Sequence, residues 1–304
     1  MTNQKIQPFF DERTYTLTYV VYDEDTKDAV VIDPVLDYEP GASAVWTESA
    51  DKAADFVEEN DLKLHYILET HAHADHLSGA RRLQERFPEA KSAIGARITE
   101  VQKLFKGVFN LSDEFPTDGR QFDVLLEDEE VLKAGSLEIE TRYTPGHTPA
   151  CATYVMDDAA FTGDALFMPD FGTGRCDFPG GSAEDMYTSV TERIYSLPDD
   201  TRTFVGHDYQ PGGRDVEFQA TVAEQKEKNV FLPASRTREE FVQARQERDA
   251  TLSAPRLLLQ SLQVNIDAGS LPAKDDNDKA YLRIPVNVFR PKTMDKETLV
   301  LEEA

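Results

Sequence analysis

Five of the six histidines in this 304-residue chain lie, together with two aspartates, at four places along the sequence. Imidazole nitrogens and carboxylate oxygens are the side-chain ligands that zinc and iron prefer, and a mixed set suits a partly open site for a divalent ion. The set consists of His71, His73, Asp75, His76, His147, Asp164 and His207. We therefore predict a metal centre built from these side chains.

The spacing within the run THAHADH at 70–76 gives a physical reason for this chemistry. His71 and His73 stand two residues apart on a turning backbone and can point to one metal ion. Asp75 and His76 come at the start of the next element, where they can face a second position or hydrogen-bond to the first ligands. Spacing alone leaves the number of metals open.

The elements that must position these side chains are short predicted strands that end just before them. Apolar, β-branched segments at 65–69, 137–143, 159–164 and 202–206 precede or contain the four places. Strand ends in an open α/β sheet converge on one rim, which is where such folds place their sites. The sequence therefore predicts that all four places meet.

The remaining pattern indicates an α/β fold, in which mixed sheets are covered by helices. We expect an antiparallel hairpin from 14–22 and 29–35, another strand at 152–156, and helices at 49–59, 80–87 and 182–197, the last capped by Ser182. Beyond residue 216 we expect charged helical stretches at 217–229 and 237–250, an apolar stretch at 254–266 and a tail at 296–304. The expected division is 1–215, a catalytic domain, and 216–304, a C-terminal helical extension packed on it.

Composition excludes several classes of protein. A net charge of −25 opposes binding to nucleic acid or to an anionic membrane surface. No run approaches the roughly 18 to 20 apolar residues of a membrane span, and the first residues lack the apolar run of a signal peptide. Two cysteines, Cys151 and Cys176, cannot form a disulfide framework for a chain of this length. We expect a cytoplasmic protein with two buried free thiols.

Four motifs together resemble the metallo-β-lactamase superfamily over about residues 14–210. They are T-H-A-H-A-D-H at 70–76, T-P-G-H-T at 144–148, F-T-G-D-A at 161–165 and G-H at 206–207. The resemblance implies an αββα sandwich, and Asp33 in I-D-P-V is similar to a structural acid of that superfamily. Because the superfamily hosts several reactions, the fold alone does not assign one.

The segment that follows Asp164 is similar to that of the persulfide dioxygenases, also called sulfur dioxygenases. It reads ALFMPDFGTGRCDFPGG, with a glycine turn followed by Arg, a small residue, Asp and Phe. Glyoxalase II enzymes instead tend to carry a Gly-Lys-Phe-type segment there. The stretches at 205–214 and 254–266 resemble the bacterial branch of the dioxygenases, although the inserted M-P-D-F and the long extension depart from the shorter mitochondrial pattern.

This resemblance implies that His71, His147 and Asp164 bind one Fe(II) and are the catalytic set. His73, Asp75, His76 and His207 would then surround that ion, or hold a second metal, since ligands for two zinc ions are all present. The implied activity oxidises glutathione persulfide with O2 and water to sulfite and glutathione, a step in sulfur metabolism and sulfide detoxification.

Substrate contacts are expected from Arg175, Tyr209 and Arg214, because an acidic enzyme for an anionic thiol needs basic groups near its site. Ion pairs of the two arginines with Asp177 or Asp215 are the alternative. His65 stands alone and is expected to be structural.

Two other functions fit the same residues. A binuclear zinc hydrolase of glutathione thioesters or lactones would use a bridging hydroxide. A metal-binding sensor or assembly partner would need the ligands but no turnover. The apolar stretch in the extension would suit either intramolecular packing or a homodimer contact.

Overall fold

Two six-stranded sheets face each other in the computed structural model, which describes residues 3–288. The expected tail at 296–304 lies outside the described residues. The first sheet has the order β1 (Gln4–Asp11), β2 (Thr16–Asp23), β3 (Asp28–Ile32), β6 (Lys63–Glu69), β8 (Lys91–Gly95) and β9 (Val124–Leu126). The second has the order β10 (Val131–Ala134), β11 (Leu137–Tyr143), β12 (Ala152–Met156), β13 (Ala159–Phe161), β14 (Arg202–Phe204) and β15 (Gln219–Thr221).

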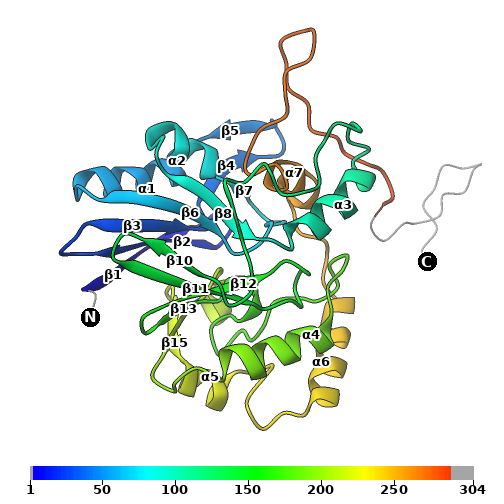
Figure 1. Ribbon diagram of the computed structural model, residues 1–304. Helices are drawn as coiled ribbons and strands as arrows, with labels where there is room; N and C mark the ends of the chain where they lie inside the picture. The colour runs from blue at the N-terminus through cyan, green and yellow to red at the C-terminus, as the bar shows by residue number, and fades with distance from the viewer. Residues whose placement is uncertain (1–2, 289–304) are drawn as a thin grey trace, which may run out of the picture.

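Helices cover the outer face of each sheet, so the molecule is the predicted αββα sandwich (Figure 1). On the first sheet lie α1 (Glu48–Glu59), α2 (Ala80–Arg86), α3 (Ile98–Val108) and α7 (Leu258–Asn265). On the second lie α4 (Ala183–Thr188), α5 (Val222–Lys228) and α6 (Arg238–Ala250). The extension is thus divided, with α5 and α6 on one sheet and α7 on the other.

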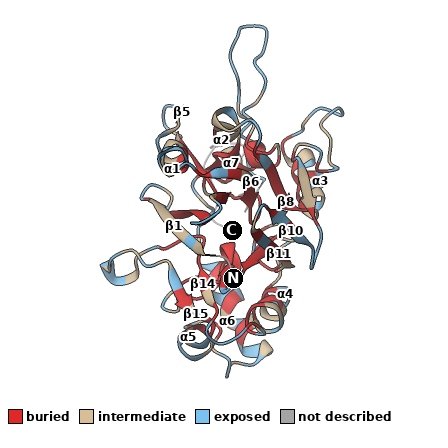
Figure 2. Ribbon diagram, turned by 60° about the vertical axis from the view of Figure 1, so that its left-hand side comes forward, coloured by how far each residue is buried: buried red, intermediate tan, exposed pale blue. Residues whose placement is uncertain are grey.

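The core between the sheets is aromatic where the strands that carry the site pass through it. Tyr19 from β2 packs edge-on against Phe161 and Phe204 from the second sheet, with ring centroids 5.2 and 5.6 Å apart. Its hydroxyl donates a hydrogen bond to the Val205 carbonyl at 2.7 Å. Figure 2 shows buried residues concentrated in this inner layer. Burial of each such ring contributes roughly 2 kcal/mol, so the strand ends beyond it start from a firmly packed position.

Antiparallel pairing of β2 with β3 confirms the predicted hairpin. β1 was not predicted from the sequence. It contains Pro8 and pairs on one side only, at the sheet edge where proline is tolerated. A small third sheet, β5 (Ala44–Trp46), β4 (Val35–Glu39) and β7 (Leu77–Ser78), was also missed.

Two helix predictions need correction. The helix expected at 182–197 is capped by Ser182, as predicted, but changes after Thr188 into a π-helical turn, η2 (Ser189–Ile194), where Ser189 bonds to the Pro145 carbonyl. The stretch at 217–229 begins as β15, because residues 219–221 pair with β14 before the helix starts at Val222. The second sheet therefore continues past residue 215, and the division at 215 stays a prediction. Within residues 3–288, every helix is too short or too polar to cross a membrane.

Candidate metal centre

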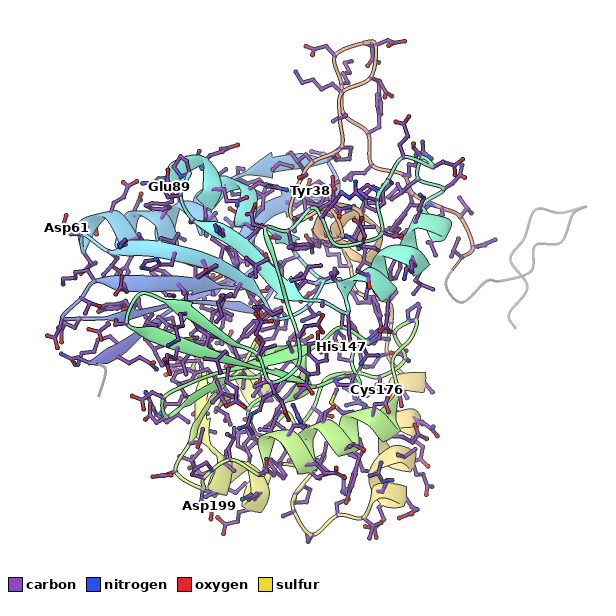
Figure 3. All side chains as sticks on the ribbon, viewed as in Figure 1. Tyr38, Asp61, Glu89, His147, Cys176 and Asp199 are labelled. Atoms are coloured by element: carbon purple, nitrogen blue, oxygen red, sulfur yellow. The ribbon has the colours of Figure 1, made fainter. Side chains whose placement is uncertain are left out.

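Strand ends bring the predicted metal-site residues to one rim between the two sheets. The segment 70–78 after β6, which we call the metal loop, carries His71, His73, Asp75 and His76. The other three follow β11, β13 and β14, with Asp164 in the short helical turn η1 (Gly163–Ala165). The rings of His71 and His147 lie 5.1 Å apart, and those of His76 and His207 lie 6.1 Å apart. Figure 3 shows His147 between the two halves of the sandwich.

Two glycines permit this close approach. Gly163 has a φ of 49°, and a Cβ there would lie 2.6 Å from Thr70 Oγ1. A Cβ on Gly174 would lie 2.1 Å from the Asp164 carbonyl oxygen. Glycine is required at both positions because any side chain would push these loops apart.

The first ligand group consists of His71, His147 and Asp164, each of which offers an atom within 4.8 Å of the others. His71 Nδ1 lies 3.0 Å from Thr70 Oγ1, and His147 Nδ1 lies 2.8 Å from the Arg175 carbonyl oxygen. These neutral acceptors fix the ring orientation and leave Nε2 of each imidazole available for a metal.

The second ligand group consists of His73, Asp75 and His207, which meet the same distance limit. His73 Nε2 is already bonded to Asp33 Oδ1 at 2.9 Å, so its Nδ1 faces the rim. His207 Nε2 lies 3.2 Å from Asp75 and 3.3 Å from Asp164 Oδ1. Asp164 thus faces both groups. His76 stacks beside His73 at 4.2 Å but belongs to neither group.

The buried polar atoms at the rim fit a metal ion. Among residues 3–288, His71 Nε2, His73 Nδ1, His76 Nε2, His207 Nε2 and Asp164 Oδ1 are buried without a hydrogen-bond partner. Each unsatisfied buried polar group costs about 1–3 kcal/mol, so five at one rim require a partner. A divalent cation satisfies imidazole and carboxylate ligands together. The chain therefore has the residues of a metal-binding site.

Burial and neighbouring charges keep the imidazoles of His71 and His76 neutral, which is the form that binds a metal. Burial, with a contribution from His73, lowers the pKa of His71 well below its ordinary value and lowers that of His76 to about 4. Burial would also lower the pKa of His73, but the Asp33 carboxylate raises it well above the ordinary value. Neutral imidazoles bind metal without first losing a proton.

Three supporting acids belong to the site, and only Asp33 was expected. Asp33 adopts a left-handed φ of 48° and also accepts hydrogen bonds from the Thr70 backbone and hydroxyl. Glu69 was missed: it is 3% exposed, lies 3.5 Å from His73 Nε2 and accepts a hydrogen bond from Ser78. Its signal in the sequence was an acid at the end of an apolar strand, directly before the histidine run.

The third supporting acid, Asp249, comes from α6 and was also missed. Its carboxylate accepts a hydrogen bond from the Cys176 backbone at 2.8 Å and pairs with Arg245 at 2.7 Å. Arg245 in turn donates to the Thr173 carbonyl at 3.2 Å. The pair therefore holds the segment that presents the Arg175 carbonyl to His147.

A cavity of about 950 Å³ opens onto the rim, with His147, Asp164 and Asp75 in its wall. Aromatic side chains, among them Phe167 and Phe171, form much of the remaining wall. Guanidinium groups from distant parts of the chain also line it: Arg13, Arg175, Arg245, Arg248 and Arg256. The arginines of α6 and the segment after it were not predicted, because only the fold brings the extension to this cavity.

The predicted substrate residues have different positions. Arg175 and Tyr209 line the cavity, although Arg175 also pairs with Asp177 at 2.6 Å, as the alternative interpretation expected. Arg214 is not among the lining residues and pairs instead with Asp208 at 2.6 Å and Asp170 at 2.7 Å. Desolvation raises the pKa of the Tyr209 hydroxyl well above its ordinary value, so it stays a hydrogen-bond donor.

The two cysteines and His65 lie outside the ligand groups. Cys151 and Cys176 are buried free thiols, and burial raises the pKa of Cys151 to about 12 and that of Cys176 further. Both therefore stay protonated at neutral pH. His65 is bonded to Asp28 at 2.6 Å, at the start of β6, the end opposite to the metal loop.

Comparison with known proteins gives one family model, described as the metallo-beta-lactamase superfamily, which matches residues 12–207. A relative named "Glyoxylase B2" from Dictyostelium discoideum is 48% identical, over 95% of this chain and 100% of its own length. The mitochondrial persulfide dioxygenase ETHE1 of Homo sapiens is 36% identical over 78% of each chain. The crystal structure of ETHE1 from Myxococcus xanthus superimposes with a TM-score of 0.70 at 30% identity, covering 88% of this chain and 100% of that one.

Proposed function

Because this chain belongs to the metallo-β-lactamase superfamily, we propose that it is an iron-dependent persulfide dioxygenase acting on glutathione persulfide. The reaction joins glutathione persulfide, O2 and water to give glutathione, sulfite and protons. The observation that carries the proposal is the group of His71, His147 and Asp164, which meet within 4.8 Å beside the large cavity. Two histidines and one carboxylate with open positions are typical of non-heme iron oxygenases.

The metal would be held by Nε2 of His71, Nε2 of His147 and the Asp164 carboxylate. When bound there, Fe(II) supplies the electron exchange with O2 that no side chain provides. The chain's own groups set the conditions for that chemistry. The Arg175 carbonyl and the Thr70 hydroxyl orient the two imidazoles, and the aromatic walls at Phe167 and Phe171 limit water around the reacting sulfur.

The cavity also suits the substrate. Glutathione persulfide carries carboxylates at its ends and an ionised sulfur, so it needs cationic groups at a distance from the metal. Among residues 3–288, the exposed guanidinium of Arg248 has no ion-pair partner, and Arg256 has only a distant contact of 3.8 Å with Glu39. We assign these arginines to the substrate carboxylates, with Tyr209 donating a hydrogen bond deeper in the cavity.

A binuclear zinc hydrolase of glutathione thioesters is the second candidate function. The second ligand group favours it, because His73, Asp75 and His207 meet the same distance limit and Asp164 faces both groups. The relative named Glyoxylase B2 also supports it. In that case the two metals would activate a bridging water for attack on the thioester carbonyl.

Reconstitution of the metal-free protein separates the two functions. One portion is loaded anaerobically with Fe(II) and another with Zn(II), and each is assayed for O2 uptake with glutathione persulfide and for hydrolysis of a glutathione thioester. We expect O2 uptake and sulfite only from the iron form. The variant His65→Gln, changed at the far end of β6, serves as a control and should match the parent. Thioester hydrolysis by the zinc form, with no O2 uptake by the iron form, would reject the proposal.

A further inference from the structure

Asn265, the last residue of α7, makes three hydrogen bonds to the backbone of the metal loop. Its Nδ2 donates to the His73 carbonyl at 2.7 Å and to the His76 carbonyl at 2.8 Å. Its Oδ1 accepts from the Ser78 backbone N–H at 2.8 Å. Asn265 is 4% exposed, so these bonds form away from water. One side chain therefore satisfies three backbone groups on either side of Asp75 and His76.

The backbone of the metal loop depends on hydrogen-bond partners from outside the loop. Residues 71–76 form neither helix nor strand, so their backbone groups gain no bonds from regular secondary structure. Four of the seven rim residues nevertheless lie in this segment. A backbone shift of a fraction of an ångström would move every ligand atom, because the side chains have few rotatable bonds. A clamp on the backbone thus fixes His73, Asp75 and His76 together.

The helix that carries Asn265 is anchored to α3 as well as to the metal loop. Leu262 and Ile266 are fully buried in one apolar cluster with Ile98, Val101 and Phe105 of α3, and Val264 shares a second cluster with Leu77 of the metal loop. α7 also lies beyond residue 207, where the superfamily match ends. The clamp is thus supplied by a part of the chain that the family match does not include.

We propose that Asn265 is a positioning residue of the metal centre and that α7 therefore helps to form the site. Its three hydrogen bonds hold the loop 73–78 in the conformation that presents metal-binding atoms to the rim. The inference concerns the ligand loop alone, so it does not depend on whether the metal is iron or zinc or on the reaction.

Gln263 of the same helix provides a matched control. Its amide donates to two backbone carbonyls, of Leu259 and Arg283, at 2.6 and 2.7 Å, and accepts from the Arg283 backbone N–H at 2.8 Å. Gln263 thus makes the same kinds of bond from a buried position but to no residue of the metal loop. Asn265→Leu and Gln263→Leu remove equal numbers of bonds and differ in what those bonds hold.

The test measures Zn(II) and Fe(II) affinity by chelator competition in the full-length variants, together with the absorption spectrum of the Co(II) form and amide exchange at residues 73–78. We expect Asn265→Leu to bind both metals about 10-fold or more weakly, to alter the Co(II) spectrum and to exchange faster at Ser78. We expect Gln263→Leu to keep parental affinity and spectrum while its melting temperature falls comparably. Equal losses of affinity in both variants, or none in either, would overturn the proposal.

Asn265→Ser guards against failure of the leucine variant to fold, because its small polar side chain leaves room for water. We expect the same direction of change in affinity and spectrum, with a smaller size. Parental affinity and spectrum in Asn265→Ser would overturn the proposal, since a water cannot hold the two carbonyls and the Ser78 N–H in one fixed geometry.

Discussion

The two ligand groups at the rim differ in how their imidazoles are held. In the first group, the far nitrogens of His71 and His147 lie against neutral oxygens, a threonine hydroxyl and a backbone carbonyl. In the second group, His207 Nδ1 also lies near a threonine hydroxyl, that of Thr16 at 3.3 Å, but His73 Nε2 is bonded to the Asp33 carboxylate at 2.9 Å with Glu69 3.5 Å away. The two groups thus differ at His73, whose far nitrogen lies against two carboxylates.

This difference separates a metal-binding role from a supporting one. Burial, with His73 as a further cause, lowers the pKa of His71, so that imidazole is neutral. The acids around His73 raise its pKa and compensate a protonated ring. The Nε2 of His73 thus already has carboxylate partners, whereas the far nitrogens of His71 and His147 have only neutral ones. On this basis we propose the first group as the preferred site for a single metal.

The largest expected effect comes from removing one histidine of each group. His147→Ala should lose bound iron and lower O2 uptake by more than about 100-fold, because it deletes a ligand. His207→Ala should keep one iron per chain and lower O2 uptake by no more than about 10-fold. Metal content by atomic emission and initial rates of O2 uptake measure both. Loss of iron in both variants alike would show that the two groups contribute equally to iron binding.

Breaking the charge pair of the second group should destabilise the fold. The Asp33 carboxylate raises the pKa of the His73 imidazole, and Asp33→Asn removes that carboxylate. Breaking a buried ion pair in this way costs about 3–5 kcal/mol in free energy of unfolding. Chemical denaturation of the metal-free protein measures the change in free energy of unfolding. A change below about 1 kcal/mol would show that Asp33 and His73 carry no compensating charges.

A second acid–histidine pair, Asp28 with His65, lies outside the metal rim. It tests whether an acid–histidine pair stabilises the fold when no metal-site residue is involved. Burial opposes ionisation of Asp28, but its hydrogen bond with His65 lowers the pKa to about 2 from an ordinary value of 3.8. A depressed carboxyl pKa stabilises the fold above pH 3.8, and this stability is lost as the pH falls through 2. Asp28→Asn should therefore cost about 2 kcal/mol at pH 7, with the difference vanishing near pH 2.

The Asp28 variant should also bind metal as the parent does, because its side chain contacts neither ligand group. Parallel denaturation curves at several pH values and a metal titration give both answers. A pH-independent difference in stability would contradict the linkage, and weakened metal binding would contradict the separation of this pair from the rim.

The smallest effect is expected at Arg248, an exposed residue in the wall of the cavity. Arg248→Ala should raise KM for glutathione persulfide several-fold and leave kcat nearly unchanged, because we assign this exposed guanidinium to a substrate carboxylate and not to the reacting sulfur. Arg202→Ala, which removes a surface pair with Asp158, is the matched control. A fall in kcat at constant KM would remove Arg248 from substrate binding.

Local signals in the sequence were sufficient to predict mixed sheets covered by helices and the meeting of the seven rim residues, whereas the αββα arrangement followed from the resemblance of four motifs to the metallo-β-lactamase superfamily. Apolar, β-branched segments mark the strands, and each ligand follows a strand end by a few residues. Local propensity failed where tertiary pairing overrode it. The charged stretch at 217–229 was predicted as helix throughout, but its first residues form β15 against β14.

Residues that act across long sequence separations could not be predicted. Asn265 contacts a loop about 190 positions earlier, and Asp249 holds the backbone of Cys176, 73 positions away. The expectation that Arg214 binds substrate came from its glycine-rich neighbours, whereas the fold pairs it with Asp170 at a separation of 44 residues. Polar partners of this kind are set by packing, and no short sequence pattern announces them.

The most direct test of the central claim is a titration of the metal-free protein with Fe(II) under anaerobic conditions, followed by measurement of O2 uptake with glutathione persulfide. We expect O2 uptake to rise linearly and to saturate at one iron per chain, and added zinc to abolish it by competing for the same ligands. Saturation at two metals per chain, or two bound zinc ions with no O2 uptake under any iron loading, would contradict the central claim.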